Sequence, residues 1–294
     1  MALLTALAGL VACGGSEPPV SVVLIAAEGR GCADAAAFAE RIGGAAFTRV
    51  WASAHDPMAA EGTLLRGTYP GAADGDALAL DAIFSGHGYR TVCLTSTAAA
   101  PAETAFDEAR TGLSTAELGA EIAKCLPGRG GRPVFVFARI GADLAGPGLV
   151  ESLLEAEPVP GSTVFALVGL GAQPGTPEER AAAVLIGPGA TAGLRSDADR
   201  SVLELAPTLL RAARLGRHPL HGADLFELHG TGPLPEIYTF GAEATSLLVD
   251  GRWRLRVPRD GGPAALYDLE MDPTESVPLD DAARIAELSA RFAY

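Results

Sequence analysis

Apolar runs alternate with segments of helical spacing along most of this chain. The runs at 20–28 (VSVVLIAAE), 132–140 (RPVFVFARI) and 162–171 (STVFALVGLG) are nearly continuous in apolar residues, which is typical of strands covered on both faces. Between such runs, segments like 33–44 (ADAAAFAERIGG) combine helix-forming residues with a terminal glycine pair. This alternation predicts a mainly parallel sheet between two helical layers, a three-layer α/β/α sandwich.

The same pattern continues to about residue 234. Strands are predicted at 47–54, 89–96 and 180–189. Helices are predicted at 58–71, 77–88, 102–111, 114–126, 148–157 and 201–216. We therefore expect one large α/β domain over residues 20–234.

From residue 235 onward the pattern is different. Apolar and polar residues alternate on both sides of Asp250 and Gly251, a pair that favours a two-residue hairpin turn. A final helix is predicted at 279–293, with an apolar face that includes Leu288. We expect residues 235–294 to form a small antiparallel subdomain, with a terminal helix, packed on the main domain.

The composition limits the partners that this chain can bind. It has 294 residues, 48% of them hydrophobic, which is ample for a large buried core. The formal net charge is −14 and the sequence pI is about 4.8. Because nucleic-acid binding needs a basic surface, we expect no nucleic-acid partner.

The N-terminus suggests export and lipid anchoring. Residues 3–13 (LLTALAGLVAC) are too short to span a bilayer but have the length of a secretory signal core. The ending LVAC resembles a bacterial lipoprotein lipobox, in which Cys13 would become the lipidated first residue. We expect residues 1–19 to be signal and tether, and the protein to be anchored in the bacterial envelope, facing the periplasm or the exterior. No Lys or Arg precedes the apolar run, and a buried strand or helix at 1–13 is the alternative.

The segment ALYDLEMDPTESVPL (265–279) carries a recognisable pattern. Its Leu-Tyr-Asp-Leu-x-x-Asp-Pro-x-Glu order resembles the C-terminal landmark of the sulfatases, in the alkaline-phosphatase-like superfamily. Asp272, Pro273 and Glu275 also fit the start of a helix. Other family landmarks are matched in the same order at 22–31, 63–70, 86–94, 184–193, 203–225 and 251–257. The resemblance implies the alkaline-phosphatase-like fold over nearly all of residues 20–280.

The resemblance also implies a divalent cation site, which this sequence matches poorly. Family members hold the cation with an acidic pair after the first strand and with Asp-His or Asp-Asn after a later strand. Here Glu28 stands at the first acidic position and Gly29 at the second, followed by Arg30. Residues 161–177 contain no Asp, Glu, His or Asn. Glu28 is therefore a vestigial metal candidate, since hard cations need several oxygen ligands together.

The nucleophile loop is also degenerate. The family's Cys or Ser lies about thirteen residues before the proline that Pro70 matches, and that position here is Pro57. The arginine that would steady the anion aligns with Glu61, so the sign of the charge is reversed. The polar residues left in this loop are His55, Asp56 and Thr63, and adjacent residues such as Ser53, His55 and Asp56 rarely form a catalytic triad.

These observations predict a sulfatase-like pseudoenzyme that binds a protein or glycan partner and needs no cofactor. The alternative is a divergent hydrolase of sulfate or phosphate esters, in which Glu28 and His55 or Thr63 serve a rearranged site with Ca, Mg, Mn or Zn. A separate cluster, His218, His221 and Asp224, has metal-ligand spacing but falls in a predicted surface loop.

Overall fold

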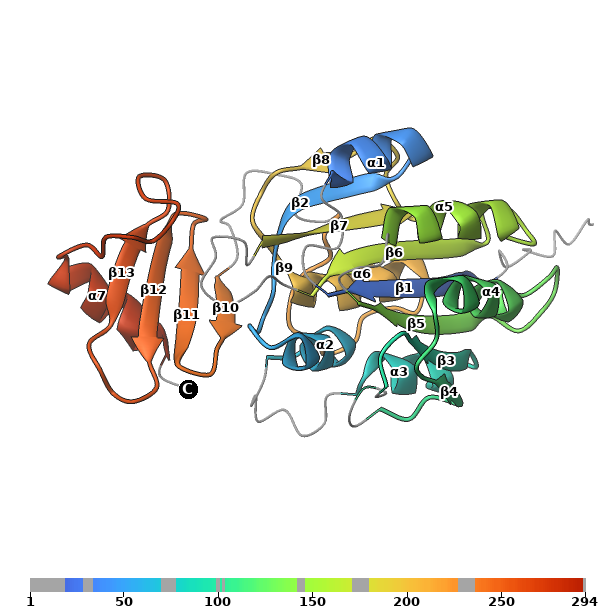
Figure 1. Cartoon of the computed structure of the whole chain (residues 1–294), viewed down its shortest axis with the longest axis horizontal. Helices are drawn as coiled ribbons and strands as arrows, with labels where there is room; N and C mark the ends of the chain where they lie inside the picture. The colour runs from blue at the N-terminus through green and yellow to red at the C-terminus, as the bar shows by residue number, and fades with distance from the viewer. Residues whose placement is uncertain are drawn as a thin grey trace, which may run out of the picture.

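The computed structural model of the chain contains two β-sheets and seven α-helices in the part that it describes (Figure 1). The described residues are 19–28, 34–69, 78–98, 101, 104–141, 146–170, 180–226 and 236–292. The predicted lipidation site Cys13, and also Gly29, Arg30 and Pro70, lie outside these ranges. None of the helices in the described ranges has the length and apolar character needed to cross a membrane.

The large sheet has nine strands in the order β4-β3-β5-β1-β6-β7-β2-β8, with β9 also paired to β2. Their bounds are β1 Ser21–Ala27, β2 Ala45–Trp51, β3 Arg90–Thr95, β4 Glu108–Arg110, β5 Val134–Ile140, β6 Thr163–Gly169, β7 Arg180–Ile186, β8 Arg195–Ser196 and β9 Arg200–Ser201. Only β7 runs antiparallel to its neighbours. The predicted mainly parallel sheet is therefore confirmed.

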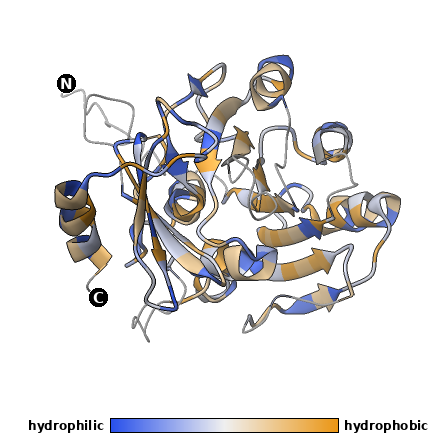
Figure 2. Ribbon diagram, turned by 60° about the vertical axis from the view of Figure 1, so that its left-hand side comes forward, coloured by the Kyte–Doolittle hydropathy of each residue, from blue (hydrophilic) through white to orange (hydrophobic). Residues whose placement is uncertain are grey.

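Helices cover both faces of this sheet, as predicted. They are α1 Ala35–Ile42, α2 Pro57–Arg66, α3 Leu80–Gly86, α4 Thr115–Cys125, α5 Gly146–Ala156 and α6 Leu205–Ala212. Alternate residues of β1 point to opposite cores: Leu24 packs with α2, α3 and α6, whereas Ile25 packs with α1, α4 and α5. Figure 2 colours most of the central strands as hydrophobic, consistent with a sheet buried on both faces.

The prediction of a helix at 102–111 was wrong. Residues 108–110 form β4, which extends the sheet parallel to β3. Asp107 fixes this pairing, because its carboxylate accepts from the Thr91 amide at 2.8 Å and its own amide donates to the Thr91 hydroxyl at 3.0 Å. Pairing at a sheet edge outweighs the local helix propensity of this segment.

The second sheet is antiparallel and follows the order β10-β11-β12-β13. Its strands are β10 Ile237–Phe240, β11 Ala244–Val249, β12 Trp253–Pro258 and β13 Ala265–Asp268, and helix α7 spans Ala282–Ser289. The hairpin predicted at Asp250 and Gly251 is confirmed, since both residues have positive φ (54° and 66°) between β11 and β12. Its loop has three residues, 250–252, rather than the predicted two, because Val249 pairs with Trp253.

The landmark segment 265–279 owes its structure to arginine–carboxylate pairs. Asp268 at the end of β13 pairs with Arg252 at 2.6 Å, and Glu275 pairs with Arg254 at 2.6 Å and Arg256 at 2.7 Å. The helix start predicted at Asp272 was wrong. Asp272 instead accepts from the amide of residue 277 and from two nearby hydroxyls, which closes a turn.

The two sheets are joined through β10. The Phe240 amide donates to the Ser53 carbonyl at 2.8 Å, and the His55 amide donates back to the Phe240 carbonyl at 3.1 Å. The Thr239 hydroxyl donates to the Ala52 carbonyl at 2.9 Å. These bonds attach the second sheet to the segment that leads from β2 into α2.

Candidate functional site

The carboxyl ends of β1, β5 and β6 lie side by side at one edge of the large sheet. Ala27, at the end of β1, is in register with Ile140 of β5 on one side and with Gly169 of β6 on the other. Glu28 follows β1, half-buried, and its amide donates to the Ile140 carbonyl at 3.0 Å. The two places where the resemblance expects metal ligands therefore do meet at one point of the fold.

A buried ion pair stands next to Glu28. Arg139 in β5 lies beside Ala26 of β1, and its Nη1 donates to Oε2 of Glu61 in α2 at 3.1 Å. Both side chains are almost fully buried, 4% and 2% exposed. Nη2 of Arg139 also donates to the Thr97 hydroxyl. A guanidinium thus occupies the side of this edge that faces α2.

The electrostatics of this site are dominated by the burial of Glu61 and by its pair with Arg139. Burial raises the pKa of Glu61 above its ordinary value, the adjacent Arg139 guanidinium opposes that rise, and the negative charge of Glu28 adds to it. The negative charge of Glu28 is therefore close enough to raise the pKa of Glu61. Glu28, Glu61, Arg139 and Thr97 are hereafter called the edge cluster.

Sequence reasoning placed Glu28 and Glu61 at this site but missed Arg139. A signal for it was present, since an arginine interrupts the otherwise apolar strand VFVFARI. A charge in a strand that is buried on both faces requires a partner. The partner itself, 78 positions away in sequence, comes from another element.

The end of β6 supplies no oxygen-bearing side chain in the described residues. Leu170 follows the strand, is fully buried, and donates its amide to the Ala27 carbonyl at 2.8 Å. The position is thus filled by an apolar side chain packed in the core. Of the stretch 161–177 that lacks acidic residues in the sequence, the described part, 161–170, ends in this buried leucine.

The degenerate nucleophile loop forms an ordinary helix start. Asp56 is the N-cap of α2, its carboxylate accepts from the Ala59 amide at 2.8 Å, and Pro57 takes the first helical position. Thr63 is buried and donates its hydroxyl to the Ala59 carbonyl at 2.9 Å. Asp56, Pro57 and Thr63 therefore have structural roles in the helix.

His55 is directed to the second sheet. A Cβ built at Gly241 would lie 2.7 Å from Nδ1 of His55, so the imidazole rests against the glycine backbone. The His55 amide bonds to Phe240, as described above. Among the candidate residues of this segment, Glu61 contacts Arg139 of the edge cluster.

We tested whether the edge cluster could hold the divalent cation that the fold family implies. In the described ranges, no three or more His, Cys, Asp or Glu side chains come together as a metal-binding group. Of the two carboxylates present, Glu61 is already bonded to Arg139, and that guanidinium would repel a second cation nearby. Calcium and magnesium require several oxygen ligands. The described residues do not fit the metal.

The residues of the sequence cluster His218, His221 and Asp224 each contact a different partner. Asp224 is buried and pairs with Arg211, and it also accepts from the Phe226 amide at 2.9 Å. The His221 ring lies near Tyr69, with 6.1 Å between ring centroids. His218 instead lies against His87, with 5.5 Å between centroids.

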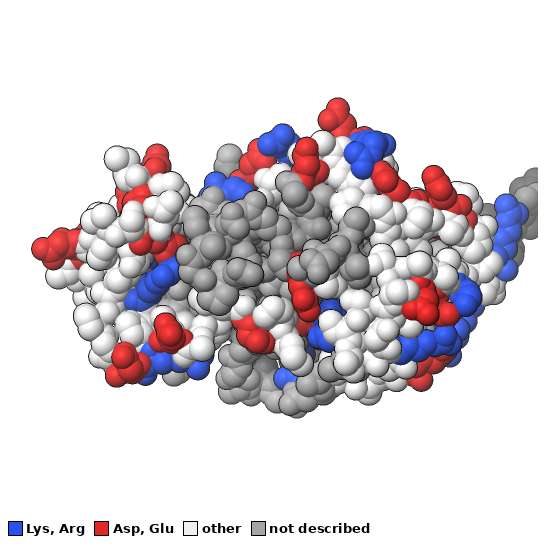
Figure 3. All heavy atoms as spheres, in the orientation of Figure 1, with Lys and Arg blue, Asp and Glu red and all other residues white. Residues whose placement is uncertain are grey.

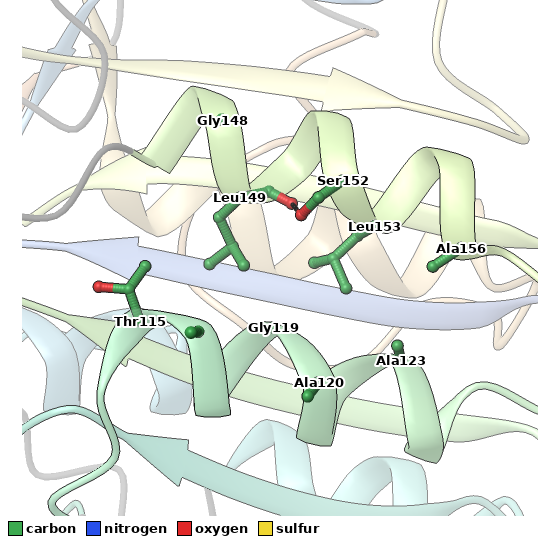
Figure 4. A pocket seen from close by; sticks show the side chains of 10 residues that line it. Thr115, Gly119, Ala120, Ala123, Gly148, Leu149, Ser152, Leu153 and Ala156 are labelled. Carbon is green, nitrogen blue, oxygen red and sulfur yellow. Dashed lines mark hydrogen bonds between the residues drawn. The ribbon is translucent and has the colours of Figure 1, made fainter.

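A groove of about 560 Å³ runs between α4 and α5 (Figure 4). Small and apolar side chains line it, with hydroxyls only at Thr115 and Ser152 among the described lining residues. The Ser152 hydroxyl donates to the Leu149 carbonyl of its own helix at 2.8 Å. This lining offers no acid, base or charge for chemistry.

Comparisons with known proteins show what this architecture is similar to. The sequence matches no protein-family model and no curated protein. Solved structures are similar over almost the whole chain. Ps i-CgsB in complex with k-i-k-neocarrahexaose has a TM-score of 0.73 at 15% identity, over 93% of this chain and 92% of that one.

Two further structures support the same assignment. A 2-O GAG sulfatase has a TM-score of 0.71 at 12% identity, over 93% of this chain and 90% of that one. A protein of the alkaline phosphatase superfamily from Vibrio parahaemolyticus has a TM-score of 0.68 at 12% identity, over 92% of this chain and 84% of that one. The chain therefore has the fold of the sulfatases in the alkaline phosphatase superfamily.

Proposed function

We propose that this protein is a sulfatase-like pseudoenzyme, a binding or structural protein of the bacterial envelope that is anchored to the membrane by lipid on Cys13. The observation that carries the proposal is the buried pair of Arg139 and Glu61 beside Glu28. A metal-dependent esterase needs free oxygen ligands at this edge, and here the protein's own guanidinium is bonded to the Glu61 carboxylate.

The energetic argument favours the ion pair over a bound metal. Removing one partner of a buried ion pair costs about 3–5 kcal/mol, because it leaves a charge without compensation. A cation that takes Glu61 as a ligand would have to separate that carboxylate from Arg139. In the edge cluster it would then recover ligand bonds from two carboxylates, Glu28 and Glu61, and at most from the Thr97 hydroxyl, which already accepts from Arg139.

The surface fits a partner of mixed polarity. On the face shown in Figure 3, acidic and basic side chains lie in small separate groups rather than in one broad basic patch. Together with the net charge of −14, this favours a protein or glycan partner over nucleic acid. The lipid anchor would hold the domain at the membrane without a spanning helix.

Metal content and turnover test the loss of catalysis. The soluble portion, residues 20–294, should contain no stoichiometric Ca, Mg, Mn or Zn after purification, and should not hydrolyse aryl sulfates or aryl phosphates. Arg139→Met serves as the matched variant, since it removes the internal cation while keeping an extended side chain. We expect Arg139→Met to bind added Ca²⁺ or Mg²⁺ more tightly than the wild type.

The competing function is a divergent, metal-dependent ester hydrolase that uses Glu28. One equivalent of bound metal, together with turnover that Glu28→Ala abolishes, would establish that function and end the pseudoenzyme proposal. Unchanged metal affinity in Arg139→Met would show that the guanidinium is not what excludes the cation.

Fractionation tests the anchor separately. In a bacterial host, the wild-type chain should be found with the membranes, and Cys13→Ala should be released into the soluble fraction. Cys32→Ala removes a different cysteine and should stay with the membranes. Equal distribution of wild type and Cys13→Ala would contradict lipidation at Cys13.

A further inference from the structure

Exposed apolar side chains are concentrated in the segment that follows β13, at the end of the molecule where the second sheet lies (Figure 1). Five large hydrophobic residues are exposed in the described part of the chain, and three of them are Met271, Val277 and Leu279, at 79%, 67% and 38%. Single exposed apolar residues are ordinary, whereas a group of them indicates an interaction site. These three residues are called the landmark patch.

Hydrogen bonds hold the landmark patch together beside one strand. The amides of Met271 and Leu279 both donate to carbonyls of β13, at 3.1 and 2.7 Å. Between them, Asp272 closes a turn, because its Oδ2 accepts from the Val277 amide at 2.8 Å. Met271 and Val277 therefore stand at the two ends of one closed turn, and the whole patch occupies a small surface next to β13.

The turn that carries the patch contains a strained residue. Glu275 has φ of 54°, a left-handed conformation that residues with a Cβ rarely adopt. Its buried carboxylate pairs with Arg254 at 2.6 Å and with Arg256 at 2.7 Å, and these pairs hold the residue in place. Strain of this kind persists only where the surroundings fix it, and it is common at binding sites. The patch is therefore presented on a pre-formed backbone, which lowers the entropy cost of binding.

The border of the patch is negatively charged. Residues 270–281 contain five Asp or Glu and no Lys, Arg or His. Three of these carboxylates pair with arginines of the second sheet or of α7, namely Glu270, Glu275 and Asp281. The other two, Asp272 and Asp280, form no salt bridge in the part of the chain that the structure describes, and they directly follow Met271 and Leu279 in the sequence. Uncompensated negative charge thus lies next to the exposed apolar side chains.

We propose that the landmark patch docks another protein, at a surface whose apolar centre is bordered by lysine or arginine. The apolar side chains provide the area that is buried, and the basic border complements Asp272 and Asp280. The same charges disfavour two other occupants. A second copy docked through its own patch would bring like charges together, and an anionic lipid surface would repel the carboxylates. The proposal rests on the binding role given under the proposed function, and it names the surface and the kind of partner.

Binding of two matched peptides tests the proposal. Both are amphipathic helical peptides with the same leucines, and their charged positions carry lysine in one peptide and glutamate in the other. The protein is the full chain with Cys13→Ala, which removes the proposed acylation site. We expect the Leu-Lys peptide to bind saturably, by fluorescence anisotropy at fixed ionic strength, and to shift NMR amide signals within 266–281. The Leu-Glu peptide should bind at least about tenfold more weakly, because its charges oppose those of the border.

Variants of exposed residues separate apolar docking from general attraction to an acidic chain. Met271→Ser and Val277→Ser should each weaken binding of the Leu-Lys peptide about tenfold, the factor for one buried side chain of this size. Tm should not change, since both residues are exposed. Met58→Ser is the matched control, because Met58 is 53% exposed on α2, and it should leave affinity within about twofold. Asp280→Asn should narrow the difference between the two peptides.

Several results would overturn the proposal. Equal affinity for the two peptides would do so, as would affinity unchanged in both Met271→Ser and Val277→Ser. Self-association in sedimentation that Val277→Ser abolishes would make a second copy the occupant, and binding to phosphatidylglycerol vesicles that Val277→Ser abolishes would make it a bilayer. Each of these four results leaves metal content, turnover and membrane fractionation as proposed above, because the landmark patch includes neither the edge cluster nor Cys13.

Discussion

Two regions of this molecule each depend on arginine–carboxylate pairs, and they use them differently. In the second sheet, Arg254 of β12 meets Glu275 at 2.6 Å, with the two side chains 2% and 6% exposed. At the edge of the large sheet, Arg139 meets Glu61 at 3.1 Å, with both side chains similarly buried. The first pair links β12 to the segment that follows β13, and the second joins strand β5 to helix α2 beside Glu28.

The difference explains which sulfatase landmarks this sequence keeps. Asp268 and Glu275 belong to the landmark at 265–279, and both bind arginines of the neighbouring loop or strand. Their carboxylates are needed whether or not the protein is a catalyst. Glu61 stands instead where the resemblance expects an anion-binding arginine, and it contributes a contact to the core. The acidic residues of the landmark thus hold the fold, and Glu61, at a position where the resemblance expects chemistry, forms a buried ion pair.

The largest effect is expected from Arg254→Met. This change leaves Glu275 buried with fewer partners and removes the guanidinium from the Trp51 ring, 5.3 Å away. Loss of one partner of a buried pair costs about 3–5 kcal/mol in the free energy of unfolding. Urea denaturation would measure it against Arg41→Met, whose pair with Glu151 is 58% and 40% exposed and whose loss should cost no more than about 1 kcal/mol. Equal losses in the two variants would show that burial does not distinguish the pairs.

A third buried pair, Arg200 with Glu204, shows the effect of a longer distance between the charged groups. Nε of Arg200 is 4.0 Å from Glu204, and burial raises the pKa of Glu204 to about 7 despite that charge. Because the folded pKa exceeds the ordinary value of 4.5, the contribution of Glu204 to stability is largest below pH 4.5 and falls as the pH rises towards 7. The fall amounts to about 3 kcal/mol at most. Glu204→Gln should flatten unfolding free energy between pH 5 and 7, and an unchanged slope would assign the loss to other groups.

The smallest effect is expected from the double change Arg139→Met with Glu61→Leu. Replacing both partners of a buried ion pair with apolar residues is often neutral or stabilising. We expect the double variant to unfold within about 1 kcal/mol of the wild type, while each single variant loses more. A double-mutant cycle in urea provides the coupling energy. A double variant as unstable as the worse single one would give the edge cluster a structural role equal to that of Arg254 and Glu275.

Much of the fold could be predicted from the sequence because its signals are local. The apolar runs at 20–28, 132–140 and 162–171 became neighbouring strands, and the Asp250–Gly251 turn formed where expected. The failures occurred where a local helix signal was outweighed by other contacts. Residues 108–110 have helix-forming neighbours but pair with β3, and Asp272 closes a turn instead of opening a helix.

The candidate site was less accessible to sequence reasoning, since it depends on pairs that are distant along the chain. Glu61 reads as one acid in a helix, and only its contact with Arg139 shows that it is neutralised in the core. In the same way, Asp224 has the spacing of a metal ligand with His218 and His221 but is committed to Arg211. Spacing along the sequence suggests which side chains could share a site, whereas the partner that each side chain contacts in the fold decides what it can do.

The hydrogen bonds between β10 and residues 52–55 determine where this protein can be truncated. Trp51 packs in one apolar cluster with Ile237, Leu248 and Leu269 of the C-terminal region. A truncation before residue 236 would expose this indole and break the backbone bridge next to α2. The change of pattern at residue 235 is therefore a poor place to divide the chain, and calorimetry of the intact protein should record a single melting transition for both sheets.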